Sequence, residues 1–412
     1  MNLTSLERSM LDGDHGDAVR QALAYQVKVG EFWNATRFVP VTNVHMMGDI
    51  EVMGDAGLDW LRALRASDGS CVVPVTTNAR CIDFACTRQF GQRPDEVAKE
   101  RELVSLLQAL HVTTTDTCIG YQAIYEPRFG ERLAWGDTGT VIYANSVLGA
   151  RSNFESGPAA LAAGLTGRVP EYGLHLDAHR RGTFTVDVRA DLDDVAEWGA
   201  LGKIVGAARP GYLEIPVFTR VSGKPDSDQL KHLGAALASY GSMAMFHLVG
   251  VTPEAPTAEA AFAGKSSAET LIVGRSEIEL ALGAPATEGP CDLVVFSGPQ
   301  LSLAEIGRLS TEFNGATVHE TTRVFVTTES SVLAEARRLG YARTLEDAGV
   351  KILVGVCFYI LLDLSEIRVR NGWRTLVTNS AKLVNTIGAH GFETVLRRTS
   401  DCVDMALTGE LR

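Results

Sequence analysis

The chain has 412 residues, of which 45% are hydrophobic and 21% are charged, a composition that is typical of globular proteins and excludes a disordered or fibrous chain. A formal net charge of -12 and a pI near 5.3 argue against a nucleic-acid or anionic-membrane partner, because both need a basic face. The length exceeds that of one ordinary core and predicts two or three subdomains.

Neither end of the chain nor its apolar segments indicate export or membrane insertion. The N-terminal residues lack a basic segment followed by an apolar one, so no signal peptide is expected. The longest apolar stretch, residues 350–364, is interrupted by Lys351 and Gly355 and is too short to span a bilayer. The seven cysteines, an odd number without a secretory context, indicate reduced thiols. These observations predict a cytoplasmic protein.

The first candidate site residues in chain order are Thr76, Thr77 and Asn78, which follow an apolar strand. Their hydroxyl and amide groups are suited to binding a carboxylate. They are equally suited to capping the next helix, and the sequence leaves both roles open.

The most distinctive segment runs from Trp135 to Glu155, where polar residues are threaded closely between small apolar ones. A buried polar group costs free energy unless it finds a partner, so this density predicts the wall of a polar cavity. Asp137 and Glu155 are candidates for a general acid and base, and Arg151 is either their ion-pair partner or a clamp for a substrate carboxylate. The other members predicted to bind substrate are Asn145, Ser152 and Asn153.

A change of pattern near residue 180 predicts an N-terminal α/β part, residues 1–180, and a C-terminal α/β part, residues 181–412. Residues 183–189 alternate as in a half-exposed strand, and residues 191–194 cap a helix that runs towards Val205. Apolar runs then alternate with capped helices, which predicts a parallel sheet. Its expected strands lie at residues 291–296, 323–326, 350–354 and 373–377.

Ligands of parallel sheets bind at the carboxyl ends of the strands, so we expect the turns after these strands to surround one site. Lys382, which follows Ser380 in the last of these turns, is the strongest single candidate for proton transfer or anion binding. Desolvation in a cleft lowers the pKa of a lysine, which would let Lys382 act as a base. The alternative, a solvated lysine at a helix N-terminus, is less favourable because of the helix dipole.

Eight segments, in this order, carry a family resemblance: Leu11–Gly16, Asn43–Gly48, Val73–Asn78, Asp116–Tyr121, Trp135–Glu155, Gly167–His175, Phe246–Glu254 and Thr378–Lys382. Together they resemble the aconitase X family, whose members dehydrate cis-3-hydroxy-L-proline or mevalonate 5-phosphate. The resemblance covers nearly the whole chain. It implies a three-layer α/β fold of the aconitase type, with parallel-sheet subdomains around a central cleft. It also directs attention to His45 and Ser380 as catalytic candidates, because both lie in matching motifs.

Members of this family pair a catalytic part of this length with a small swivel domain, either fused or as a separate subunit. No segment remains after Arg412 to supply that domain. Either a second chain completes the site or the protein works without one, and the resemblance implies the former, a separate small swivel subunit.

The family binds an iron–sulfur cluster or another iron centre through three cysteines, and an open iron acts as a Lewis acid on the leaving hydroxyl. Cys118 and Cys357 lie at two of these positions, but Gly298 replaces the cysteine of the family's Gly-Cys-Pro-His turn. Two thiolates could still hold one iron or zinc ion if His45 or a carboxylate joined them. The alternative is that both cysteines are small buried residues and that no metal is bound.

Phe154 replaces the arginine of the family's Thr-Asn-Arg-Glu motif and removes an anion-binding guanidinium, which predicts a changed substrate or reaction. The first hypothesis is a lyase that acts on a small carboxylate or hydroxy/imino acid by α-proton abstraction and β-elimination, without a normal four-iron cluster. Lys382 or Asp137 would move the proton. The alternatives are a metal-independent isomerase, cyclase or decarboxylase of a biosynthetic pathway, and a non-catalytic ligand-binding subunit.

Overall fold

Three parallel sheets organise the computed structural model, which describes residues 1–265, 269–283 and 289–411. The first sheet has the order β4-β3-β2-β5, with β2 (Asn43–Met46), β3 (Val75–Thr77), β4 (Val112–Thr113) and β5 (Leu133–Trp135). The second has the order β10-β7-β8-β9, with β7 (Phe184–Arg189), β8 (Pro216–Thr219), β9 (His247–Leu248) and β10 (Thr270–Gly274). The third has the order β14-β13-β12-β15-β16, with β12 (Leu293–Phe296), β13 (Arg323–Thr328), β14 (Lys351–Val354), β15 (Thr375–Thr378) and β16 (Glu393–Leu396).

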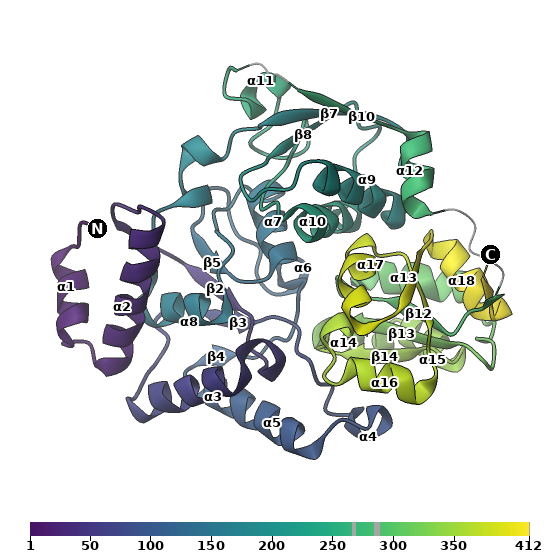
Figure 1. Cartoon of the computed structure of the whole chain (residues 1–412), viewed down its shortest axis with the longest axis horizontal. Helices are drawn as coiled ribbons and strands as arrows, with labels where there is room; N and C mark the ends of the chain where they lie inside the picture. The colour runs from purple at the N-terminus through teal and green to yellow at the C-terminus, as the bar shows by residue number, and fades with distance from the viewer. Residues whose placement is uncertain (266–268, 284–288, 412) are drawn as a thin grey trace.

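Helices connect and cover these sheets, and Figure 1 shows the three regions as separate lobes that meet near α7, α10 and α17. Around the first sheet lie α1 (Ser5–Asp12), α2 (Asp17–Phe32), α3 (Ile50–Ala66), α4 (Thr87–Phe90), α5 (Pro94–Ala109), α6 (Gly120–Ala123), α7 (Thr138–Ser146) and α8 (Gly157–Thr166). The second region has α9 (Val195–Ala208), α10 (Ser227–Gly241), α11 (Ala258–Ala261) and α12 (Arg275–Leu282). The third has α13 (Leu303–Phe313), α14 (Ser330–Arg338), α15 (Tyr341–Asp347), α16 (Leu364–Asn371), α17 (Ala381–Ile387) and α18 (Thr399–Thr408).

Short elements complete the described fold. Two antiparallel pairs join β1 (Phe38–Pro40) to β6 (Arg168–Pro170) and β11 (Gly289–Pro290) to β17 (Glu410–Leu411). The 3-10 turns are η1 (Gly173–His175), η2 (Asp177–His179), η3 (Phe358–Ile360) and η4 (Gly388–His390). No helix in the described part of the chain combines the length and the apolar character needed to cross a membrane.

The third sheet confirms the strands predicted for the second half of the chain. All four residues of β12 are fully buried, as a strand with helices on both faces requires. The chain enters this sheet at β12, proceeds to β13 and β14, and then crosses back to β15 and β16. The strand order therefore reverses between β12 and β15, and open α/β sheets bind ligands at such a point.

The second sheet differs in one respect from the prediction. β7 was expected to be half-exposed, but four of its six residues are buried, because it is an inner strand between β10 and β8. The helix predicted after it is confirmed as α9, whose N-cap Asp194 forms a capping box with Glu197. The expected α/β class with parallel-sheet subdomains is therefore confirmed.

Candidate active site

A buried ion pair joins the first region to the third. Asp137 follows β5 and caps α7, where its Oδ2 accepts a hydrogen bond from Thr140 N at 2.9 Å. Lys382 lies in the first turn of α17, and its Nζ is 3.7 Å from Asp137 Oδ1, with both side chains 5% exposed. Because a helix N-terminus disfavours a cation, the carboxylate of Asp137 is what stabilises the ammonium there.

The charge of Lys382 differs from the sequence-based expectation. Burial lowers its pKa, but Asp137, Tyr359 and the cysteines Cys118 and Cys357 raise it, and the net pKa lies above the ordinary lysine value. Nζ also lies 5.8 Å from the centre of the Tyr359 ring. The predicted lowering of the pKa is therefore wrong. Lys382 is an ammonium at neutral pH and can donate a proton or bind an anion, but it is not a ready base.

His45, on β2, is a candidate for the base, because Lys382 is charged and cannot readily accept a proton. Its Nδ1 is 2.9 Å from Thr76 Oγ1 on the neighbouring strand β3. Its Nε2 is buried and has no hydrogen-bond partner among the described residues. Burial lowers the pKa of His45, although Asp137 and Asn78 favour the charged ring. Burial therefore favours the neutral imidazole, whose Nδ1 is held by Thr76 and whose Nε2 lies near Asn78 and the main chain of Thr117.

The rest of the predicted Thr76–Asn78 segment divides between two roles. Thr77 Oγ1 donates to Asp116 Oδ1 at 2.9 Å and accepts from Asp116 N at 3.1 Å, so it fixes the loop that leads to Cys118. Asn78 Nδ2 donates to Met47 Sδ at 3.0 Å, while its buried Oδ1 has no partner in the described part of the protein. Asn78 therefore keeps an acceptor for a ligand, and Thr77 does not.

Ser380 joins the turn after β12 to the start of α17, at the point where the strand order of the third sheet reverses. Its Oγ donates to Gly298 O and accepts from Leu383 N at 3.1 Å, so it caps α17 and holds the turn after β12. Lys382 follows two residues later. Ser380 therefore fixes the start of the helix that carries the ammonium.

Cys118 and Cys357 are both buried near Lys382. The Sγ of Cys118 accepts from Gln300 N at 3.2 Å, and the Sγ of Cys357 is 3.9 Å from Ser297 Oγ. Burial raises the pKa of both thiols, for Cys118 to about 12, so both are protonated.

The polar segment after β5 is bonded mainly to the main chain. Asn145 Nδ2 donates to Ser152 O at 2.9 Å and to Ala244 O at 3.0 Å, and its Oδ1 accepts from Ser152 N. Ser152 Oγ accepts from Trp135 N and donates to Asn153 O. Asn153 Nδ2 donates to a carbonyl oxygen, and its Oδ1 accepts from a main-chain N–H and from a tyrosine hydroxyl. These amides and hydroxyls hold an irregular buried segment in place.

Arg151 is not the partner of Asp137 or Glu155 that the sequence suggested. It pairs with Asp177, which is 85% exposed, and donates to His175 O at 3.0 Å. Glu155 is instead buried without a basic partner: its Oε1 has no hydrogen bond to any described residue, and burial raises its pKa to about 7. Glu155 thus titrates near neutral pH.

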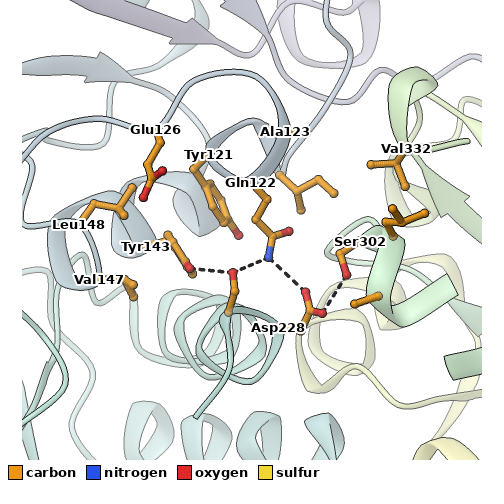
Figure 2. A pocket seen from close by; sticks show the side chains of 14 residues that line it. Tyr121, Gln122, Ala123, Glu126, Tyr143, Val147, Leu148, Asp228, Ser302 and Val332 are labelled. Carbon is orange, nitrogen blue, oxygen red and sulfur yellow. Dashed lines mark hydrogen bonds between the residues drawn. The ribbon is translucent and has the colours of Figure 1, made fainter. Parts of the chain in front are cut away.

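A cleft with a volume of about 650 Å³ lies between α6, α7, α10 and α13 (Figure 2), and its described lining includes Tyr121 but not Asp137, Lys382 or His45. Gln122 Nε2 donates to Ser227 Oγ at 2.7 Å and to Asp228 Oδ1 at 3.1 Å across it. Burial raises the pKa of Tyr121, and the nearby charges of Asp137 and Asp228 raise it further, so this cleft residue lies within electrostatic reach of the ion pair. The described lining contains the carboxylates of Glu126 and Asp228 but no Lys, Arg or His.

Comparison with known families accounts for nearly all of this chain. Sequence models described as the aconitase X first, second and third domains match residues 1–178, 182–283 and 291–408. The chain belongs to the aconitase X family.

The relatives of this aconitase X chain carry the names of two activities. The phosphomevalonate dehydratase large subunit of Methanosarcina mazei is 31% identical, over 100% of this chain and 98% of the relative. The cis-3-hydroxy-L-proline dehydratase of Pseudomonas aeruginosa is 32% identical, over 99% of this chain and 70% of the relative. The crystal structure of Thermococcus kodakaraensis aconitase X in its holo-form matches with a TM-score of 0.87 and 29% identity, covering 98% of this chain and 100% of that one. The expected fold is thereby confirmed.

The residues present do not fit the three-cysteine iron site implied for an aconitase X protein. Gly298 offers no donor at the third position, and the neighbouring Gln300 side chain bonds to the loops around Cys118. Among the described residues, no three His, Cys, Asp or Glu side chains are grouped so that they could hold a metal ion.

Sequence reasoning missed several residues of this aconitase X site. Tyr121 stacks on Tyr143 with ring centres 4.0 Å apart, and Tyr359 lies beside Lys382. An aromatic residue in an apolar stretch ordinarily predicts core packing. The available indications were positional: Tyr121 ends the resembling segment Asp116–Tyr121, and Tyr359 lies two residues after Cys357.

Proposed function

We propose that this chain is a hydro-lyase of the aconitase X type that removes water from a small hydroxy acid. The supporting observation is the buried Lys382–Asp137 pair close to His45, whose Nε2 has no partner in the described structure. A β-elimination needs a proton acceptor and a proton donor at the same time, and this cluster offers a neutral imidazole and an ammonium. The relatives, all named as dehydratases, favour this reaction over isomerisation, cyclisation, decarboxylation or a non-catalytic role.

In the proposed reaction, His45 Nε2 takes the proton from the carbon next to the substrate carboxylate. The electron pair of that C–H bond forms the C=C bond, and the C–O bond breaks towards the oxygen. Lys382 gives a proton to this oxygen, which leaves as water. The imidazolium of His45 then loses its proton to solvent, and Lys382 takes a proton from solvent. The net change is the loss of one water molecule from the substrate. Asp137 keeps Lys382 charged between turnovers.

The other candidate residues take supporting roles in this proposal. Thr76 orients the imidazole of His45, and Ser380 positions the first turn of α17. Asn78 offers its free Oδ1 to substrate, and Glu155 is a second group that can exchange protons at neutral pH. Asn145, Arg151, Ser152 and Asn153 stabilise the wall of the site, and Thr77 stabilises the loop before Cys118.

The charge of the cleft favours a substrate without a phosphate group. Phosphate sites are built from Arg and Lys side chains. The charged side chains in the described lining of the cleft are those of the acidic residues Glu126 and Asp228. Phe154, at the family's arginine position, packs edge-on against Tyr212. We therefore place the substrate among small hydroxy or imino acids, of the kind named for the Pseudomonas relative, and not among phosphate esters.

A separate small swivel subunit completes the proposed enzyme. Relatives of full matching length are named as large subunits, and the Pseudomonas relative extends beyond the matched part. We also retain the cytoplasmic location and the division into residues 1–180 and 181–412 as proposals.

The experiment is a dehydration assay of the full chain, alone and with a candidate small subunit, on cis-3-hydroxy-L-proline and on phosphomevalonate. We expect turnover of the first substrate and about a 1000-fold loss of kcat/KM in Lys382→Met. Lys203→Met is the matched control, because Lys203 is a half-buried lysine that donates to Ala281 O at 2.9 Å and has no ion pair among the described residues. Activity of Lys382→Met within tenfold of the control would show that the ammonium is not part of the reaction.

A further inference from the structure

Three loops from two different sheets converge on the buried thiols. Residues 114–119 follow β4 of the first sheet, whereas residues 297–302 and 355–357 follow β12 and β14 of the third. Strand pairing within one sheet cannot fix the position of the first loop relative to the other two. A contact between the loops has to do so.

Arg80 makes one such contact, because its main-chain N donates to Gly355 O at 2.9 Å and its side chain pairs with Asp116, but it does not reach residues 297–302. Gln300 makes the contact that includes all three loops. The residue is fully buried, and its Oε1 accepts from Cys118 N at 3.1 Å. Its Nε2 donates to Asp116 O and Val356 O, both at 3.2 Å, and lies 3.4 Å from Thr328 O. Its main-chain N donates to Cys118 Sγ at 3.2 Å. One carboxamide thus bonds to the chain after β4, at the end of β13 and after β14, and uses both of its protons.

The same turn occupies the second thiol. Ser297 Oγ lies 2.7 Å from Thr327 Oγ1, accepts from Phe358 N at 3.2 Å and lies 3.9 Å from Cys357 Sγ. Both sulfur atoms therefore have hydrogen-bond partners supplied by residues 297–300.

We propose that Gln300 is a cross-link that holds these three loops together in place of a three-thiolate cluster, so that the chain assembles its Cys118–Cys357 site without iron and sulfide. A cluster would join the loops by metal–sulfur bonds and contribute its binding energy to folding. Here buried hydrogen bonds to one side chain do this, and removing that side chain leaves several main-chain groups unpaired. The inference concerns assembly and does not depend on which reaction is catalysed.

The first test measures metal on the wild-type chain. After anaerobic reconstitution with iron and sulfide, we expect no stoichiometric sulfide and no visible charge-transfer band, and chelation should leave Tm unchanged. Stable incorporation of iron and sulfide in stoichiometric amounts would overturn the proposal. This measurement needs no variant, so it decides even if a Gln300 variant does not fold.

The second test measures how fast each thiol is alkylated in the native protein, mapped by mass spectrometry. In Gln300→Ala we expect alkylation of Cys118 and Cys357 to be at least tenfold faster, with buried Cys402 unchanged. Gln92→Ala is the control, because Gln92 is also buried and donates to Leu362 O and Cys81 O, away from these thiols. Rates within twofold of the wild type in Gln300→Ala, or an equal rise in the control, would refute the cross-link.

Discussion

The buried carboxyl group of Glu100, on α5, should make the stability of this protein strongly pH-dependent. Glu100 is fully buried, and its Oε2 accepts from Ile50 N at 2.8 Å. Arg80 lies 3.6 Å from its Oε1 and also pairs with Asp116, in the loop before Cys118. Burial, and then the charge of Asp49, raise the pKa of Glu100 to about 8, although Ile50 N–H and Arg80 oppose the shift. An ordinary glutamate titrates near about 4.3.

The direction of the effect follows from this difference. The folded protein holds the Glu100 proton more tightly than the unfolded chain, so its contribution to stability is complete below about pH 4 and is lost as the pH rises towards 8. Within that window one extra proton is bound in the folded state, which corresponds to about 1.4 kcal/mol per pH unit. Between about pH 5.5 and 7.5, Glu100 alone should lower the free energy of unfolding by about 3 kcal/mol.

Glu100→Gln removes this titration and keeps the shape and the acceptor for Ile50 N. The assay is urea unfolding followed by circular dichroism at several pH values. We expect the variant to gain about 3 kcal/mol relative to the wild type between about pH 5.5 and 7.5. Glu102→Gln, two residues along the same helix, changes a carboxylate that pairs with Arg62 at the surface and should show no such gain. Parallel pH curves for the wild type and Glu100→Gln would refute the reasoning.

Three further predictions concern the site and its wall. Asp137→Asn removes the counter-ion of Lys382, so the pKa of the lysine should fall and the alkaline limb of the kcat pH profile should move to lower pH. An unchanged profile would contradict a role of this ion pair in the reaction. Thr76→Val should lower kcat about tenfold or more by freeing the imidazole, and Thr76→Ser should restore most of it; equal kcat values would argue against this role. Arg180→Met breaks the ion pair with Glu254 and three hydrogen bonds to carbonyl oxygens, so its free energy of unfolding in urea should fall by about 3–5 kcal/mol. Arg151→Met should lower it by at most about 1 kcal/mol, because the partner Asp177 is exposed. Equal losses would show that burial does not decide between these two arginines.

The third sheet could be predicted from sequence because its strands are buried on both faces. Such strands are continuous apolar runs, and polar turn residues mark their carboxyl ends. Lys382 was identified for the same reason, because it follows a strand end, whereas Asp137 was identified because it lies in the dense polar segment after Trp135. Their pairing could not be predicted, because it depends on how the first region packs against the third. The error in the charge of Lys382 has the same origin: burial alone lowers the pKa, and the sequence does not show the carboxylate 3.7 Å away.

The polar segment after β5 shows a different limit. Its density of amides and hydroxyls was correctly judged unusual, but density does not distinguish a ligand-binding wall from a buried irregular chain. Main-chain N–H and C=O groups outside helices and sheets still need partners when they are buried. Asn145 and Ser152 supply those partners, and Arg180, which the sequence did not suggest, donates to the carbonyls of Asn145, Ala150 and Leu174.

Charge balance explains why the replacement of one cysteine is compatible with an anionic substrate. A site made from thiolates carries negative charge that a bound metal must offset. Here Cys118 and Cys357 are neutral thiols, and Lys382 faces the single carboxylate of Asp137. The described core of the site is therefore close to neutral before substrate arrives. A substrate carboxylate can then share the ammonium with Asp137 without meeting further negative charge, and the same ammonium remains available to protonate a leaving hydroxyl.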